Sequence, residues 1–185
     1  MELTGKLLIA MPGIGDPRFE HAVIFLCSQG EDGAMGLIVN KPAAGVALGE
    51  LLEQLDIGGE DSPAAALPVR FGGPVETQRG FVLHSDDYVS DVSSLKVAPG
   101  FSMTATLDIL EDIARGAGPE QLLVLLGYAG WGPDQLESEI AMNGWLTTDA
   151  SPELVFGTED DAKWGAALKT LGVDPLTLSA SAGHA

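Results

Sequence analysis

Five side chains between positions 131 and 145 form the best candidate binding surface of this chain: Trp131, Gln135, Glu139, Asn143 and Trp145. The three polar members recur every fourth residue, a spacing that aligns side chains along one side of a helix. One tryptophan precedes that helix and the other follows it. We interpret the row as the polar wall of a pocket roofed by Trp131 or Trp145, suited to a small ligand or a protein partner.

The same row has a structural alternative, in which its polar groups bond the nearby backbone and Trp131 packs in the core. Most buried polar groups are structural, so this alternative stays open. The helix is expected to begin near Pro133 with Gly132 as its N-cap. Leu136 then faces the core, and Glu139 lies at the border of that face, partly buried.

A glycine turn, Gly72-Gly73-Pro74, is a candidate neighbour of this surface. Successive backbone N–H groups can bind an anion, but only the two glycines can donate because proline has no N–H. The pattern is neither a phosphate-binding Walker loop nor a dinucleotide fingerprint. A tight turn that needs unusual backbone angles explains it more simply.

The sequence predicts no catalytic residues. His84 is followed by Ser85 and Asp86, but neighbours on a strand point to opposite faces, and a catalytic triad is assembled from distant parts of a chain. No Gly-x-Ser-x-Gly elbow occurs. The alternative is an enzyme of unknown reaction that uses Glu139 or His84 as a general acid or base.

No metal site or cofactor is predicted either. The histidines, His21, His84 and His184, lie far apart in the sequence, and there is no second cysteine to pair with Cys27 as a zinc ligand. Cys27 ends an apolar run and is expected to be a small buried hydrophobe. A redox-sensing thiol would need exposure and a positive neighbour.

The length, composition and charge of the chain indicate how many domains to expect and which partners to exclude. A chain of 185 residues, 45% of them hydrophobic, can bury one sizeable core, so a single domain over residues 1–185 is expected. Nine basic residues face 27 acidic ones, for a formal net charge of −18, which repels nucleic acids. Direct nucleic-acid binding is therefore not expected unless Lys41, Arg70 and Arg79 converge.

With no long apolar run and no recognisable secretory signal, we expect a cytoplasmic protein that does not enter membranes.

The remaining patterns predict strands followed by helices mixed with strands. Strands are expected at residues 6–10, 22–27, 36–40, 69–71, 81–84, 101–106, 121–126 and 144–148. Helices are expected at 48–55, from 107 to a stop at Gly116, from 133 onwards, and between an N-cap at Thr158 and a stop at Gly172. This order favours an α+β fold with a mixed sheet.

Four sequence segments carry a family resemblance. They are LIAMP (residues 8–12) with DPRF (16–19), GAMGLIVNKP (33–42), FGGPV (71–75) with RGFVLH (79–84), and GYAGW (127–131) with QLE (135–137) and NGWL (143–146). Together with the ending GHA (183–185), they identify the chain as similar to the bacterial YqgE/AlgH family over essentially its whole length. Residues 58–68 and the acidic loop after Ser85 do not carry the pattern.

The resemblance implies a single α+β domain with a branched, partly barrel-like sheet surrounded by helices. The family has no established enzymatic activity. Its description as a regulator comes from alginate biosynthesis in one branch of the family. No catalytic set comes with it. Our hypothesis is a non-enzymatic cytoplasmic binding or regulatory domain, with a role in transcriptional regulation through protein contacts. The rivals are the enzyme above and a DNA-binding transcription factor.

Overall fold

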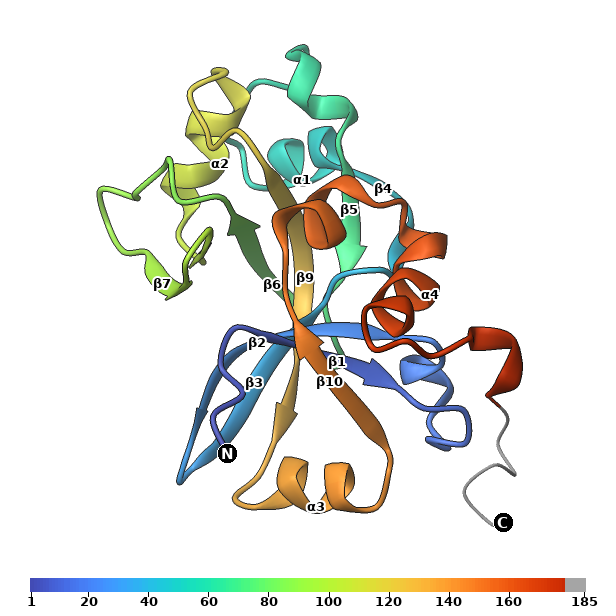
Figure 1. Ribbon diagram of the computed structural model, residues 1–185. Coiled ribbons are helices and arrows are strands. Elements are labelled where there is room, and N and C mark those ends of the chain that lie inside the picture. Colours follow the sequence, from blue (N-terminus) through green and yellow to red (C-terminus); the bar gives the residue numbers. More distant parts are fainter. Residues whose placement is uncertain (179–185) are drawn as a thin grey trace.

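A computed structural model describes residues 1–178, and its central element is the ten-residue strand β9 (Leu122–Trp131). The first half of β9 pairs in parallel with β5 (Pro68–Phe71) and antiparallel with β6 (Val75–His84). Its second half pairs antiparallel with β3 (Gly33–Ile38). The strand predicted at 121–126 is therefore real but continues to Trp131, and it joins two parts of one curled sheet (Figure 1).

The other strands extend the sheet on both sides of β9. Along the main path the order is β10 (Trp145–Asp149), β1 (Lys6–Ala10), β2 (Val23–Gly30), β3, β9, β6, β8 (Phe101–Thr104) and β7 (Leu95–Ala98). Off this path, β4 (Pro42–Ala47) pairs with β5. The result is a mixed, half-barrel sheet with helices around it, which confirms the predicted α+β fold.

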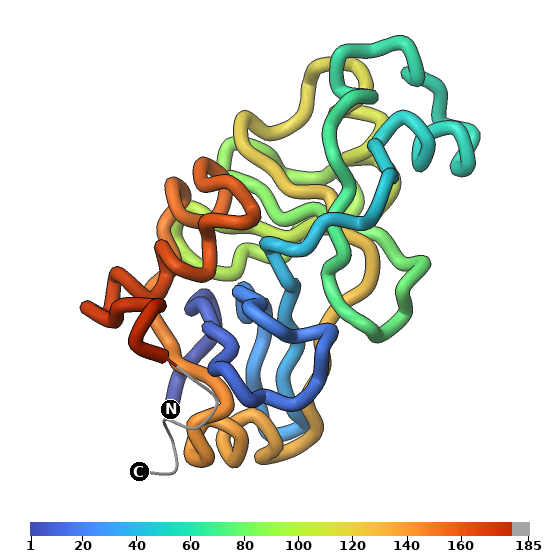
Figure 2. Tube along the Cα trace, turned by 90° about the vertical axis from the view of Figure 1, so that its right-hand side faces the viewer, coloured from blue at the N-terminus to red at the C-terminus, as the bar shows by residue number. Residues whose placement is uncertain are grey.

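Helices occupy opposite ends of the molecule. The helices α1 (Leu48–Gln54) and α2 (Leu107–Ala114) lie at one end, and α3 (Gln135–Ala141) lies at the other, in both views (Figures 1 and 2). The longest helix, α4 (Asp160–Thr170), packs beside β1 and β2. Short helical turns span Pro17–Phe19, Pro63–Ala66, Glu153–Gly157 and Pro175–Thr177. No helix within residues 1–178 is long and apolar enough to cross a membrane.

The buried side chains form three clusters that follow this arrangement. One cluster lies between the curled sheet and α4, with Phe25 and Leu168 among its members. A second lies under α3 and holds Trp131, Leu136 and Trp145. The third lies under α1 and α2; its buried members are Leu48, Leu52, Val69, Val82, Ile109, Leu110, Ile113 and Val124. Because successive strand residues face opposite sides, each strand can supply more than one cluster.

Glycines make the partner exchange along β9 possible. Gly127 has a φ of 77°, and a Cβ on it would lie 2.2 Å from the carbonyl oxygen of Gly73. A Cβ on Gly73 would lie 2.0 Å from the carbonyl carbon of Tyr128. No side chain fits between these backbones, so the glycine signatures at 72–73 and 127 are explained by a close strand crossing.

Several sequence-based boundaries need correction. Helix α3 begins at Gln135, two residues after Pro133, and Asp134, with a φ of 62°, stands at its N-cap in place of Gly132. Thr158 does not cap α4; its hydroxyl donates to the carbonyl of Glu153. Strands β4 and β7 were not predicted. The family-like ending at residues 183–185 lies outside the described residues.

Candidate functional site

The side chain of Glu139 is the centre of the candidate surface. Its Oε1 accepts hydrogen bonds from the indole N–H groups of Trp131, at 3.2 Å, and Trp145, at 2.9 Å. Its Oε2 accepts from the amide of Gln135 at 2.9 Å. Four of the five predicted residues therefore meet around one carboxylate.

Each partner comes from a different element. Trp131 is the last residue of β9, Trp145 is the first of β10, and α3 joins the two strands. Leu136, which is buried as predicted, fixes the inner side of α3 against the core. The two indoles lie edge to face with ring centres 6.0 Å apart. Both rings are buried. Trp131 therefore packs in the core, as the structural alternative expects, and also donates a hydrogen bond to Glu139.

Asn143 stands apart from this network. It follows α3 with a φ of 63°, its backbone N–H bonds the carbonyl of Ile140, and its side chain is exposed. An asparagine in the left-handed region is a common helix terminator. The next residue, Gly144, donates its N–H to the carbonyl of Glu139 at 2.8 Å. Asn143 thus turns the chain from α3 into β10 and does not line the pocket described next.

A cavity of about 250 Å³ opens beside Glu139. It is lined by Ile14, Asp16, Phe19, Gly130, Trp131, Gln135, Glu139 and Trp145. Asp16 is neutralised by Arg18, whose guanidinium lies 2.7 Å from it. Within residues 1–178, no Lys, Arg or His comes within ion-pair distance of Glu139. The cavity thus combines aromatic walls with one carboxylate whose bonds come only from neutral N–H donors.

The glycine turn does not belong to this cavity. The N–H of Gly72 donates to the carbonyl of Leu126 at 2.7 Å, and its own carbonyl accepts from Ile38 at 2.8 Å. Gly73 packs against the backbone of Tyr128, and neither glycine is exposed. Pro74 follows and leads into β6. The contacts of Gly72 and Gly73 are those of a strand crossing at residues 126–129 of β9, and none of Gly72, Gly73 and Pro74 lines the cavity beside Glu139.

His84 is buried and bonded through both ring nitrogens. Its Nδ1 donates to the carbonyl of Ser85 at 2.8 Å, and its Nε2 lies 2.8 Å from the hydroxyl of Thr104. Because a carbonyl can only accept, the neutral ring carries its proton on Nδ1. Burial lowers the pKa of His84 and outweighs the opposing effects of the Ser85 carbonyl and the nearby carboxylates. This is the geometry of a structural histidine.

The basic residues named in the sequence converge only in part. Lys41 and Arg70 line one cavity of about 590 Å³, whereas Arg79 lies elsewhere, over the ring of Phe81 at 5.0 Å. Arg70 pairs with Asp160 at 3.0 Å. The cavity therefore also carries acidic groups.

Beneath that cavity lies a buried lysine that the sequence did not single out. The Nζ of Lys163 donates to the carbonyl of Val39 at 2.8 Å and to Asp160 at 3.2 Å, and its side chain is only 1% exposed. Burial lowers its pKa, although Asp160 opposes the shift. These bonds attach α4 to the chain that follows β3.

Cys27 is buried as expected, and burial raises the pKa of its thiol to about 12. A thiol of this kind reacts slowly because the thiolate is the nucleophile. Among residues 1–178, no cluster of three or more His, Cys, Asp or Glu side chains is arranged to hold a metal ion.

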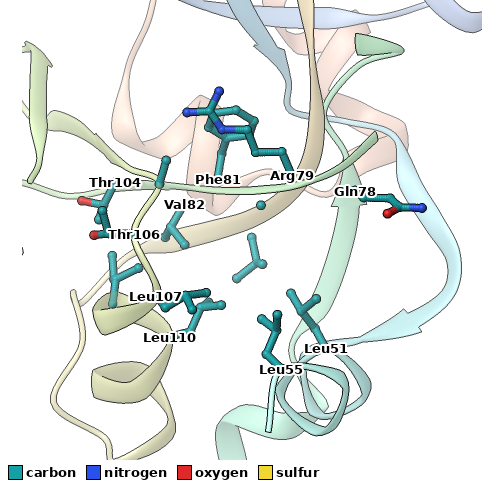
Figure 3. Close-up of a pocket in the computed structure, with 14 residues that line it drawn as sticks. Leu51, Leu55, Gln78, Arg79, Phe81, Val82, Thr104, Thr106, Leu107 and Leu110 are labelled. Atoms are coloured by element: carbon teal, nitrogen blue, oxygen red, sulfur yellow. The ribbon is translucent and has the colours of Figure 1, made fainter. Parts of the chain in front are cut away.

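Sequence reasoning missed a third cavity, at the α1–α2 end, which we call the leucine pocket (Figure 3). It has a volume of about 230 Å³ and is lined by Leu51, Leu55, Gln78, Arg79, Gly80, Phe81, Val82, Thr104, Ala105, Thr106, Leu107, Ile109, Leu110 and Val124. Leu51 and Leu55 come from α1 and its end, and Leu107 and Leu110 come from α2. The only sequence signal was the apolar spacing of the two helices, which equally predicts ordinary core packing.

Comparison with known proteins decides the family. Residues 7–176 match a family model described as AlgH-like. The chain belongs to the AlgH-like family. A UPF0301 protein of Ruegeria pomeroyi is 69% identical to this AlgH-like chain over the full length of both, and one of Paracoccus denitrificans is 56% identical over 99% of this chain and 97% of its own.

Two solved structures share the fold. The solution structure of the AlgH protein from Pseudomonas aeruginosa is 41% identical, covers 92% of this chain and 89% of its own, and superposes with a TM-score of 0.79. A crystal structure of a protein from Corynebacterium diphtheriae is 19% identical over 92% and 87% of the two chains, with a TM-score of 0.72, and shows the fold alone. The family resemblance seen in the sequence is confirmed.

Proposed function

We propose that this AlgH-like chain is a non-enzymatic binding domain that recognises a positively charged side chain of a protein partner in the Glu139 cavity. The observation that carries the proposal is the Glu139 carboxylate itself. Three neutral donors hold it in place, and aromatic rings stand beside it. An ammonium or guanidinium group is attracted both to a carboxylate and to aromatic rings.

The charge of the whole chain supports the same reading. A formal net charge of −18 speeds the approach of a basic partner and repels nucleic acid. A regulatory role would then operate through protein contacts and not through direct DNA binding. The single buried thiol suits the reducing cytoplasm, where we place the protein.

The enzyme alternative receives no support from His84. A general base must reach the proton that it removes, but both ring nitrogens of His84 are engaged and the side chain is fully buried. Glu139 remains accessible from the cavity, yet the residues that line it include no Ser, Thr, Cys, Lys or His to act with it.

The test uses small cations that imitate a basic side chain. Butylguanidinium and butylammonium are titrated into the protein, with butylurea as the neutral control, and the indole N–H signals of Trp131 and Trp145 are followed by NMR. We expect saturable shifts with the two cations and none with the urea. Glu139→Gln keeps an acceptor oxygen but removes the charge, so it should abolish the response. Equal responses in both proteins, or no saturable shift with either cation, would disprove the proposal.

A further inference from the structure

We propose that the leucine pocket is a docking site for a basic peptide segment of a partner protein, which inserts one large apolar side chain. This site lies at the opposite end of the molecule from Glu139 and does not depend on the function proposed above (Figure 1). In Figure 3, Leu51 and Leu55 face Leu107 and Leu110 across the pocket, and Val82 lies on its β6 wall.

The two threonine hydroxyls that line the pocket are already bonded. The hydroxyl of Thr104 lies 2.8 Å from His84 Nε2 and 2.6 Å from the hydroxyl of Ser94. The hydroxyl of Thr106 donates to Asp108 at 2.5 Å. A polar group inserted here would lose its water without finding these partners free, whereas an apolar group gains from burial. The inserted group is therefore apolar.

The size of the pocket selects a side chain over a whole small molecule. Its volume of about 230 Å³ is below the ~300–1,000 Å³ of typical small-ligand sites. Pockets that take one aromatic or aliphatic anchor are the usual energetic centres of protein interfaces. Leu55 and Leu107, which line the pocket, are still 39% and 52% exposed, so they offer apolar surface to residues that flank the anchor.

The charge of α1 and α2 indicates which residues of the peptide flank the inserted side chain. The sequences of α1 and α2 contain no lysine or arginine and carry the acidic residues Glu50, Glu53, Asp108, Glu111 and Asp112. Asp112 is paired with Arg115, which follows α2, and the other four have no ion pair among the described residues. Arg79 contributes to the wall, but its guanidinium lies on the other side of β6, over the ring of Phe81 (Figure 3). Complementary charge guides association and disfavours the wrong partner, so the flanking residues of the peptide should be basic.

A missing side chain keeps the pocket open. A Cβ placed on Gly80 meets no atom within 4 Å, and Gly80 has no unusual φ. Because Gly80 and Val82 are two residues apart on β6, they face the same side of the strand, towards the pocket. Valine at position 80 would therefore fill the pocket without backbone strain. Gly30, at the end of β2, is equally open and unstrained and serves as the matched control.

The experiment follows the leucine and valine methyl signals of the full chain by NMR during titration with a capped peptide that has two central leucines between pairs of lysines. Two further peptides replace the leucines by alanines or the lysines by glutamates. We expect saturable shifts at Leu51, Leu55, Leu107 and Leu110 with the first peptide only. Gly80→Val should weaken its binding by about tenfold or more, and Gly30→Val should leave it unchanged.

Leu107→Gln, at an exposed position, gives a second pocket variant should Gly80→Val fail to fold, and it should also weaken binding. Unchanged affinity in both variants, or shifts confined to other methyls, would overturn the site. Equal binding of the peptide with glutamates in place of lysines would overturn the charge requirement. A dimer that buries these leucines in the absence of peptide, seen by analytical ultracentrifugation, would make a second copy the occupant. Because the indole signals of Trp131 and Trp145 report the other cavity, failure at one site is distinguishable from failure at the other.

Discussion

The cavities at the two ends of this molecule differ in the side chains that line them. At the α3 end, polar atoms point inward and are held by hydrogen bonds from two indoles and an amide. At the α1–α2 end, the cavity is mainly apolar, and a Cβ on Gly80 would find open space there. The first arrangement suits recognition of charge, and the second suits burial of a hydrocarbon group.

The largest effect is expected when the carboxylate of Glu139, at the α3 end, is removed. Glu139→Ala deprives the buried N–H groups of Trp131 and Trp145 of their acceptor. A buried donor left without a partner costs about 1–3 kcal/mol, and water from the adjoining cavity relieves part of this cost. We expect the free energy of unfolding, measured by urea denaturation, to fall by about 2–3 kcal/mol.

The control for this prediction is Glu139→Gln. It retains an oxygen acceptor for the indoles, so its loss of stability should be about 1 kcal/mol. If the alanine and glutamine variants were equally stable, the hydrogen bonds to Trp131 and Trp145 would carry no net stabilisation, and the α3 end would be held by apolar packing alone.

The same contrast explains what could be predicted from the sequence. The row through Gln135 and Glu139 is predictable because fourth-residue spacing brings polar side chains together on a helix whatever the surrounding fold. Its meeting with Trp131 and Trp145 follows from their places in the strands before and after one short helix. Asn143 shares the spacing but lies after the last helical residue, where the backbone turns and the side chain leaves the row.

The leucine pocket could not be predicted in this way. Leu51, Leu55, Leu107 and Leu110 have the spacing of buried helix faces, and nothing local distinguishes a filled face from an open one. The gap depends on Gly80, which lies far from both helices in the sequence and meets them only through the sheet. A glycine that leaves space beside a strand, as Gly80 does, produces no periodic pattern in the sequence.

Among the strands, the apolar runs and the edge strand β10 are predictable from the sequence, whereas β4 and β7 are not. Strand β1 has the predicted bounds, Lys6–Ala10, because it is a buried apolar run. Strand β4 (Pro42–Ala47) contains Pro, Ala and Gly, which are poor strand formers, and its partner β5 induces its extended form. The turn at Gly72 and Gly73 was recognised as unusual, but its cause, a crossing with Gly127, needs the third dimension. The single domain over residues 1–185 stays a prediction.

A second test asks whether the wall of the leucine pocket depends on the neutral form of His84, which is bonded to Thr104 there. Burial lowers the pKa of His84 in the folded chain, against the opposing influence of the carbonyl of Ser85 and of Asp87 and Asp86. The unfolded chain therefore binds a proton more readily, starting near its ordinary pKa of about 6.5. Stability due to the neutral ring is complete above that pH and is lost as the pH falls towards the lowered folded pKa.

The measurement compares the free energy of unfolding of the parent chain and His84→Gln at a series of pH values below 7. One proton limits the difference in slope to about 1.4 kcal/mol per pH unit, and the parent should be the steeper. Parallel curves would show that His84 does not control the pH response of this wall, whatever the other carboxylates contribute.

The smallest expected effect is a gain of stability. Gly80→Val adds apolar atoms to an open cavity, restricts the unfolded chain, and places a good strand former in β6. Burial alone is worth about 0.8 kcal/mol for each methylene-sized group, so the free energy of unfolding should rise by about 1 kcal/mol. Gly30→Val shares the restriction of the unfolded chain but buries less, and it should gain less. If the two variants gained equally, or if Gly80→Val were destabilised, the space beside Gly80 would not be the open apolar cavity on which the contrast between the two ends rests.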